Sequence, residues 1–223
     1  GVFYVTPDSF SDGGEFNTPL VALNQAVALT ENGADIIDVG GQSTRPGAEQ
    51  ISLEEELERV LSVIEVIRPK INVPISVDTT RAKVAKAAID AGANIVNDIS
   101  GGTFDSSMFS TVAELKVPIV LMHIRGTPQT MQQMTDYQDV IKEISDFLSQ
   151  QINAATAAGI EREKIIIDPG IGFAKNLEQN LEIFRRLTEL KKLNSPILVG
   201  PSRKSFIGRI LNQPDPKARV WGT

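Results

Sequence analysis

The chain has 223 residues, of which 41% are hydrophobic, and this is enough for one sizeable domain with one core. Its formal net charge of -6 argues against a nucleic-acid partner, and the absence of cysteine excludes disulfides, thiolate metal sites and a cysteine nucleophile. No apolar stretch approaches the roughly 18 residues that a membrane span needs, and no signal peptide is visible. We therefore expect a soluble, cytoplasmic protein without a membrane partner.

Aliphatic runs alternate with helical patterns along the whole chain. The runs predict seven strands, at residues 2–6, 35–39, 73–78, 94–98, 117–122, 164–168 and 196–200. The helical patterns cover residues 18–32, 52–68, 80–91, 105–115, 138–158 and 177–193, and a last helix begins near Ser202. One strand and one helix take about 30 residues, the size of a βα repeat. Strict alternation predicts an all-parallel sheet.

Several helix ends carry recognisable signals. Ser52 and Glu55 have the spacing of a capping box, and Asp105 and Asn176 are good N-cap residues. Gly33 and Gly92 each precede a strand in two similar segments, where we expect them to stop the preceding helix.

The predicted fold class is α/β, with the topology of a TIM (β/α)₈ barrel, which has eight strands. Seven of them can be placed in this chain, and both of its ends fall inside expected elements. We therefore expect one domain over residues 1–223 that is truncated at both ends, so that the eighth strand is missing.

Polar side chains end four of the predicted strands, at Asp38, Asp78, Asn97 and Asp168. The carboxyl ends of parallel strands are where such folds carry their chemistry. Any one of these residues could simply cap the next helix, but clustered carboxylates repel one another and need a cation, a metal or a donor-rich ligand. His123 is the sole histidine, which disfavours a metal, so a heterocycle with amino and N–H donors fits better. We interpret His123 itself as a structural residue.

Four loops at the same end of the predicted strands are rich in glycine and polar residues. Residues 5–14 could be an ordinary connection or a functional loop. In residues 40–48, Arg45 carries a fork suited to carboxylate or phosphate. Phe173 lies in a glycine-rich loop and could offer a flat apolar surface, whereas residues 200–208 could bind an anion or a carbonyl group.

Seven segments together resemble dihydropteroate synthase. They occur in the family's order and cover nearly the whole chain: residues 5–14 (VTPDSFSDGG), 40–47 (GGQSTRPG), 76–79 (SVDT), 97–101 (NDISG), 122–123 (MH), 168–173 (DPGIGF) and 202–205 (SRKS).

The resemblance implies a (β/α)₈ barrel and a transferase of folate biosynthesis that is a target of sulfonamides. Such an enzyme condenses 6-hydroxymethyl-7,8-dihydropterin diphosphate with 4-aminobenzoate, and it releases diphosphate. The resemblance also implies Mg²⁺ as cofactor and a homodimer.

The resemblance further implies two sets of site residues. The first set would bind the pterin: Asp78, Asn97, Ile99, Met122, Asp168, Phe173 and Lys204. Within it, Asp168 would bind the aminopyrimidine edge, and Lys204 the ring carbonyl or a ring nitrogen. The second set would form the aminobenzoate and diphosphate loops: Thr6, Asp8, Ser9, Phe10, Thr44, Arg45, Pro46 and Ser205. Asp38 we expect to support the second loop.

The chain departs from the family pattern in two places. Tyr4 stands where the family has an Asn that helps to hold Mg²⁺, and a phenol is a poorer Mg²⁺ ligand than a carboxamide. The family's late Arg-x-His element is absent before Thr223. Two alternatives stay open at this point: a methyltetrahydrofolate:corrinoid methyltransferase-like barrel, and a pterin-binding protein without catalytic activity.

Overall fold

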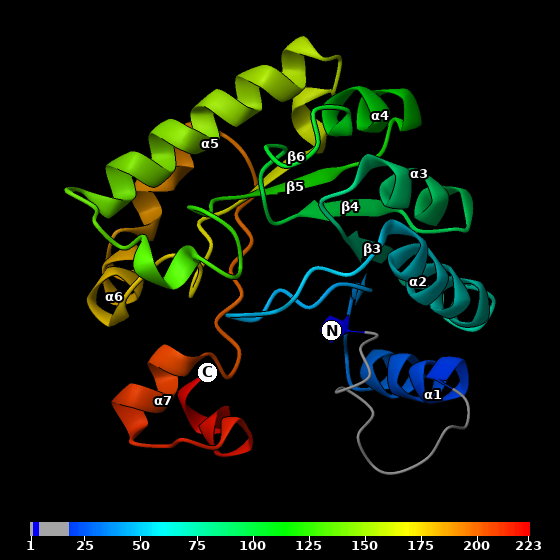
Figure 1. Ribbon diagram of the computed structural model, residues 1–223, viewed down its shortest axis with the longest axis horizontal. Helices are drawn as coiled ribbons and strands as arrows, with labels where there is room; N and C mark the ends of the chain where they lie inside the picture. Colours follow the sequence, from blue (N-terminus) through cyan, green and yellow to red (C-terminus); the bar gives the residue numbers. More distant parts are fainter. Residues whose placement is uncertain (1, 5–17) are drawn as a thin grey trace.

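A computed structural model describes residues 2–4 and 18–223 of the chain. Its strands are β1 (Val2–Tyr4), β2 (Ile37–Gly40), β3 (Ile75–Asp78), β4 (Ile95–Asp98), β5 (Ile119–Met122) and β6 (Ile165–Asp168). Its α-helices are α1 (Thr18–Glu31), α2 (Leu53–Ile67), α3 (Ala82–Asp90), α4 (Met108–Leu115), α5 (Val140–Ala157), α6 (Leu177–Arg185) and α7 (Ser205–Leu211). Short 3₁₀ helices are η2 (Met131–Gln133), η3 (Arg162–Lys164), η4 (Leu187–Leu193) and η5 (Pro216–Gly222). Figure 1 shows their arrangement.

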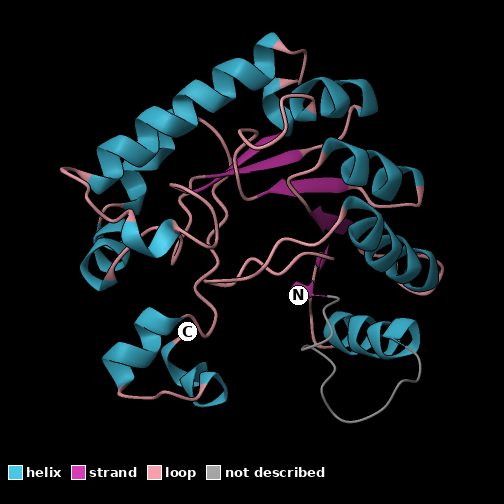
Figure 2. Cartoon of the chain, viewed as in Figure 1, coloured by secondary structure: helices cyan, strands magenta, loops and turns pink. Residues whose placement is uncertain are grey.

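The strands form one parallel sheet in the order β1-β2-β3-β4-β5-β6, which is also their order in the sequence. This confirms the predicted parallel α/β architecture, because neighbouring strands in a barrel follow one another along the chain. Figure 2 shows the strands inside an arc of helices. Among the described residues, no helix is long and apolar enough to cross a membrane.

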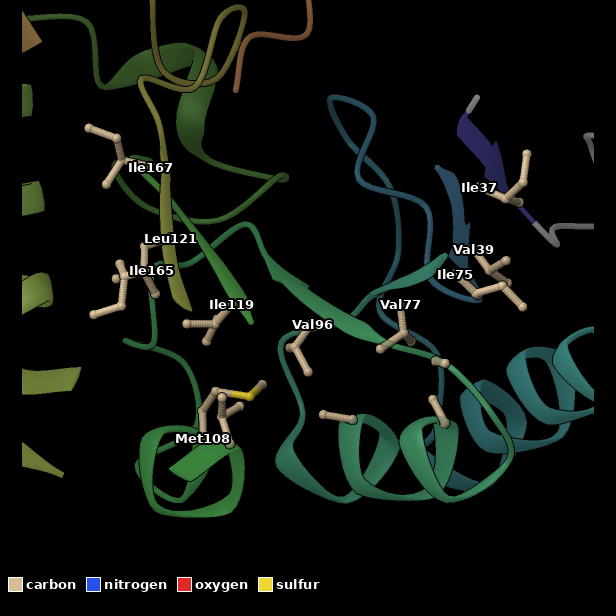
Figure 3. Packing of buried hydrophobic residues seen from close by; sticks show 14 of the residues in the cluster. Ile37, Val39, Ile75, Val77, Val96, Met108, Ile119, Leu121, Ile165 and Ile167 are labelled. Atoms are coloured by element: carbon tan, nitrogen blue, oxygen red, sulfur yellow. The ribbon is translucent and has the colours of Figure 1, made fainter. Parts of the chain in front are cut away.

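The main core lies between the sheet and its helices, and it is almost entirely aliphatic. Alternate strand residues, such as Val39, Val77 and Val96, point toward the helices and are fully buried (Figure 3). The side chains between them, including Asp78 and Asn97, therefore face the opposite, inner side of the sheet. At the ends of β3 and β4 the alternation thus directs Val77 and Val96 to the core, and Asp78 and Asn97 to the barrel interior.

Two of the three predicted N-cap residues cap the helices for which they were predicted. Ser52 accepts a hydrogen bond from the N–H of Glu55 at 3.1 Å, and Asn176 forms a complete capping box with Gln179. The prediction that Asp105 caps its own helix is wrong, because α4 begins at Met108. The N-cap of α4 is Ser107, whose N–H donates to Asp105 Oδ1 at 2.9 Å. Asp105 Oδ2 accepts from the N–H of Ala82 at 2.8 Å, so Asp105 caps α3 from the neighbouring βα unit. Gly33 and Gly92 have φ angles of 93° and 112°, as expected of helix stops.

Two predicted elements differ in the last third of the chain. The expected helix 177–193 is divided at Arg186 into α6 and η4, where the Arg186 guanidinium binds Glu182, Glu189 and Asp139. The expected strand 196–200 consists of a single parallel bridge between Ile197 and Ile167. Its location beside β6 agrees with the predicted strand order, although the two segments share no further bridge.

Asp98 is a fully buried carboxyl on the outer face of β4. Its Oδ1 accepts from the N–H and the hydroxyl of Ser100 at 2.8 and 2.6 Å, and its Oδ2 accepts from the N–H of Gly102 at 3.0 Å. Burial raises the pKa of Asp98 to about 6, although these hydrogen bonds oppose the shift. The carboxyl thereby fixes the loop that follows β4.

We expect Asp98→Ala to lower the free energy of unfolding by about 3 kcal/mol, because three buried donors lose their acceptor. The folded-state pKa is raised, so the contribution linked to this proton is fully present below pH 3.8 and is lost as the pH rises through about 6. Urea unfolding of both proteins should therefore give a difference that shrinks with rising pH in this window. A difference that grows with pH would contradict the assigned direction.

Candidate functional site

Three polar side chains meet on the inner face of the sheet. Asp78 ends β3 and is directly opposite Asn97 in β4, while Asp168 ends β6 opposite Met122 of β5. Asp78 and Asp168 are buried, with 3% and 7% of their surface exposed. The predicted strand-end residues therefore line one interior, which is the arrangement that a ligand rich in donors requires.

Asp38 lies beside Asn97, and this contact was not predicted. The Asn97 Nδ2 donates to Asp38 Oδ2 over 3.1 Å. Burial raises the pKa of Asp38, and hydrogen bonds from Ser76 and Asn97 oppose that shift. Asp38 thus orients the carboxamide of Asn97 inside the barrel, whereas the sequence led us to expect it to support the second loop.

The loop after β6 fixes the Asp168 carboxylate through a backbone hydrogen bond. Asp168 Oδ1 accepts from the N–H of Gly170 at 2.7 Å. Gly170 has a φ of +72°, and a Cβ there would lie 2.0 Å from the carbonyl oxygen of His123, so glycine is required. Burial raises the pKa of Asp168, and the charges of Lys204 and Lys175 act in the opposite direction.

Lys204 brings a cation to the same interior. Its Nζ donates a hydrogen bond to the carbonyl oxygen of Ile171 and lies 4.6 Å from the centre of the Phe173 ring. Burial lowers the pKa of Lys204 to about 8, although the charges of Asp168 and Asp78 favour the ammonium form. Lys204 therefore lies within electrostatic reach of Asp168 and Asp78, two of the residues that the family resemblance groups with it.

An apolar wall completes this interior. A second hydrophobic cluster, separate from the main core, contains two of the residues predicted to line the pterin pocket, and the third, Phe173, packs against it. Its members are Ile99, Met122, Ile124, Met131 and Ala174. Flat apolar surfaces of this kind suit an aromatic ring.

A cavity of about 460 Å³ opens between the second loop and the loops after β3, β4 and β5. Asp78, Thr44 and Ile99 line it together with Gln42, Ala48, Gln50, Thr79, Thr80, Thr103, Phe104, Thr127, Pro128 and Gln129. Of the second-loop residues, Thr44 is buried at this cavity, whereas Arg45 and Pro46 are exposed. The sequence identified Thr44 but missed the hydroxyl and amide groups of the other loops.

The second loop is folded around a side chain that the sequence analysis did not single out. Gln42 Nε2 donates to the carbonyl oxygens of Ser43 and Glu49 at 2.8 and 2.9 Å, and its Oε1 accepts from the N–H of Ile51 at 2.8 Å. The N–H of Gly47 donates to the carbonyl oxygen of Pro128 at 3.0 Å. The loop is thereby joined to the loop after β5, across the cavity.

Of the other second-set residues, Ser205 is exposed and is the first residue of α7. Thr6, Asp8, Ser9 and Phe10 lie outside the described residues.

His123 and Lys175 form a buried pair next to the site. His123 packs edge-on against Phe147, with ring centres 5.0 Å apart, and burial lowers the pKa of His123 to about 2. A histidine that stays neutral at physiological pH fits the structural role predicted for it. Lys175, which the sequence analysis did not select, lies with its Nζ 3.1 Å from His123 Nδ1.

Among the described residues, no group of three or more His, Asp or Glu side chains could hold a metal ion. Tyr4 belongs to β1, but its side chain is outside the described part of the chain. The Mg²⁺ site therefore stays a prediction from the family resemblance.

Comparisons with known proteins agree on one family. The model of the pterin binding enzyme family matches residues 1–223. The dihydropteroate synthase of Synechocystis sp. is 59% identical over 223 residues, which cover 100% of this chain and 77% of that protein.

Solved structures show the same relationship. The Xanthomonas albilineans dihydropteroate synthase with 4-aminobenzoic acid is 42% identical, with a TM-score of 0.94 over 100% of this chain and 79% of that one. The same enzyme with 7,8-dihydropteroate gives 40% identity and a TM-score of 0.90, again over 100% of this chain and 79% of that one. This agreement confirms the predicted α/β barrel. The chain belongs to the pterin binding enzyme family and, within it, to the dihydropteroate synthases.

Proposed function

We propose that this chain condenses 6-hydroxymethyl-7,8-dihydropterin diphosphate with 4-aminobenzoate to give 7,8-dihydropteroate and diphosphate. The observation that carries the proposal is the convergence of Asp78, Asn97 and Asp168 on one interior that also holds the Lys204 ammonium group. The relatives named above are dihydropteroate synthases, and one of their structures contains dihydropteroate.

The polar groups of this interior would bind the edge of the pterin ring, and its apolar residues would pack against the faces of the ring. The Asp168 carboxylate would accept hydrogen bonds from the amino group and a ring N–H, side by side, as carboxylates do with arginine. Asp78 and Asn97 would bind the remaining ring donors and acceptors, and Lys204 would donate to the ring carbonyl or a ring nitrogen. The cluster around Met122 would pack against the flat ring.

The bond changes need no covalent intermediate with the protein. The bond between the exocyclic methylene carbon and the diphosphate oxygen breaks, and its electron pair leaves with diphosphate. The aromatic amine then forms the new C–N bond and loses a proton to solvent. Positive charge develops on the methylene carbon in between, and the buried carboxylates of Asp78 and Asp168 would stabilise that charge electrostatically.

The second-set residues would bind the other reacting groups. Thr44, Arg45 and Pro46 would close over the diphosphate and help to form the aminobenzoate pocket, with Thr6, Asp8, Ser9 and Phe10 of the first loop. Ser205, at the first residue of α7, would lie near the aminobenzoate carboxylate. Mg²⁺, if bound, would neutralise charge on the departing diphosphate.

Three further properties belong to the proposal. We infer a single domain over residues 1–223 from the unbroken alternation of strands and helices, a cytoplasmic location from the composition of the chain, and a homodimeric assembly from the family resemblance.

An assay of both products tests the proposed reaction. We expect diphosphate release that depends on 4-aminobenzoate and is matched by an equal amount of dihydropteroate. A corrinoid acceptor with methyltetrahydrofolate serves as the control, and we expect no methyl transfer. Pteroate binding without turnover would instead identify a pterin-binding protein, and methyl transfer would favour the corrinoid-dependent alternative.

A further inference from the structure

The buried side chain of Lys175 makes three polar contacts but lies outside the predicted pterin-binding set. It is 4% exposed, and its Nζ lies 2.8 Å from the carbonyl oxygen of Phe173, 3.1 Å from His123 Nδ1 and 3.4 Å from the carbonyl oxygen of His123. Lysine is almost never fully buried unless it is paired. Two backbone carbonyl oxygens and one imidazole nitrogen surround this Nζ, so each of its N–H groups has a partner within reach.

These three contacts join two different parts of the barrel. His123 directly follows β5, whereas Phe173 lies in the loop that follows β6. The two parts approach closely, because a Cβ on Gly170 would lie 2.0 Å from the His123 carbonyl oxygen and 3.2 Å from Lys175 Nζ. Lys175 thus links the end of β5 to the tightest point of the loop.

The same loop carries two residues of the proposed pterin site. Asp168 begins it and is bound to the N–H of Gly170, and Phe173 accepts from Lys175 through its backbone carbonyl. Desolvation lowers the pKa of Lys175 well below its usual value, while the Asp168 charge acts in the opposite direction and favours the ammonium form. Desolvation is the larger of these two influences, so the link that Lys175 makes within the loop rests on its hydrogen bonds.

We propose that Lys175 is a positioning residue, whose buried amine holds the loop after β6 against the end of β5 and so sets Asp168 and Phe173 for pterin binding. The pterin part of this inference rests on the proposed function. A second part of the inference does not depend on that function. Lys175 Nζ lies 3.1 Å from His123 Nδ1, and we infer that the amine is the donor, so that the neutral imidazole carries its proton on Nε2.

The tautomer of His123 can be measured without overlap from other imidazoles, because His123 is the sole histidine of the chain. Nitrogen NMR of the wild-type chain should show one imidazole in the Nε2–H tautomer. In Lys175→Met the donor is lost, and we expect the two ring-nitrogen signals to move toward those of a mixture of tautomers. A wild-type imidazole with its proton on Nδ1 would overturn the inference.

Calorimetry with pteroate tests the positioning role on the same proteins. We expect Lys175→Met to weaken pteroate binding by at least about tenfold, since small displacements of positioned groups are costly. Lys175→Gln keeps an amide donor and should lie between Lys175→Met and the wild type. Lys86→Met, on the exposed face of α3, is the matched control and should leave both readouts unchanged.

The outcomes separate this inference from the proposed function. A folded Lys175→Met protein that binds pteroate within twofold of the wild type would overturn the positioning role. If wild type itself fails to bind pteroate, the proposed function is wrong, and the histidine tautomer still decides on the contact with Lys175. If Lys175→Met does not fold, the positioning role is tested by the pteroate affinity of Lys175→Gln, which should be below that of the wild type. The contact with His123 is then tested by the tautomer of the wild-type imidazole.

Discussion

Asp168→Asn should weaken pteroate binding by about 100-fold, because the pterin donors lose a charged acceptor and a hydrogen bond to a charged group is worth about 1.5–3 kcal/mol. The substitution hardly changes the shape of the side chain. Its carbonyl oxygen must stay with the N–H of Gly170, so its amino group would face the donors of the pterin. The side-chain amino group and the N–H donors of the pterin would then face each other, whereas the wild-type carboxylate accepts hydrogen bonds at this position.

The fold should survive this change. Burial raises the pKa of Asp168, so the charged form is disfavoured in the folded protein, and a neutral side chain relieves that cost. The melting temperature should therefore stay at or above that of the wild type. Asp90→Asn, on an exposed part of α3, is the matched control and should leave affinity unchanged. Equal affinity of Asp168→Asn and wild type would show that Asp168 does not bind the pterin edge.

Lys204→Met should lower kcat/KM by about 30-fold, because the pterin loses a hydrogen bond from a charged donor, worth about 1.5–3 kcal/mol. Methionine keeps most of the length and apolar volume of the lysine side chain. It can still pack on Phe173, so the loss would report the ammonium group rather than the contact with the ring. Lys191→Met, on exposed η4, is the matched control.

The pH profile should identify the same group. The pKa of Lys204 is lowered to about 8, so its ammonium form is present below that pH and is lost above it. Pteroate affinity of the wild type should fall as the pH rises through about 8, by more than in Lys204→Met. The ligand's own titration is common to both proteins, so the difference between the two profiles reports Lys204. Parallel profiles would remove Lys204 from pterin binding.

The sequence predicts most of the fold because local pattern and tertiary environment agree. Short continuous runs such as Ile165–Ile167, bounded by turn residues, are typical of strands buried between two packed faces, and polar residues near the ends of such strands indicate the site. Because parallel strands end at the same edge of a sheet, the sequence pattern also predicts that Asp78, Asn97 and Asp168 lie near one another. Ser52 and Asn176 show that helix starts are equally local, since a cap and its donor lie within one turn.

The features that the sequence does not predict depend on contacts between distant residues. Asp105 caps a helix that begins at Ala82, in a different βα unit. Lys175 is one lysine among several until the fold brings it to His123, and Gln42 is an ordinary loop residue until its amide meets Glu49 and Ile51. A local pattern cannot identify such partners.

A crystal structure of the chain with 7,8-dihydropteroate tests the central claim most directly. We expect the aminopyrimidine edge on the Asp168 carboxylate, the ring against Met122 and Phe173, and the Lys204 Nζ at the ring carbonyl or a ring nitrogen. A pterin ring seated instead beside Thr103 and Phe104, away from Asp168, would contradict the site proposed for this chain.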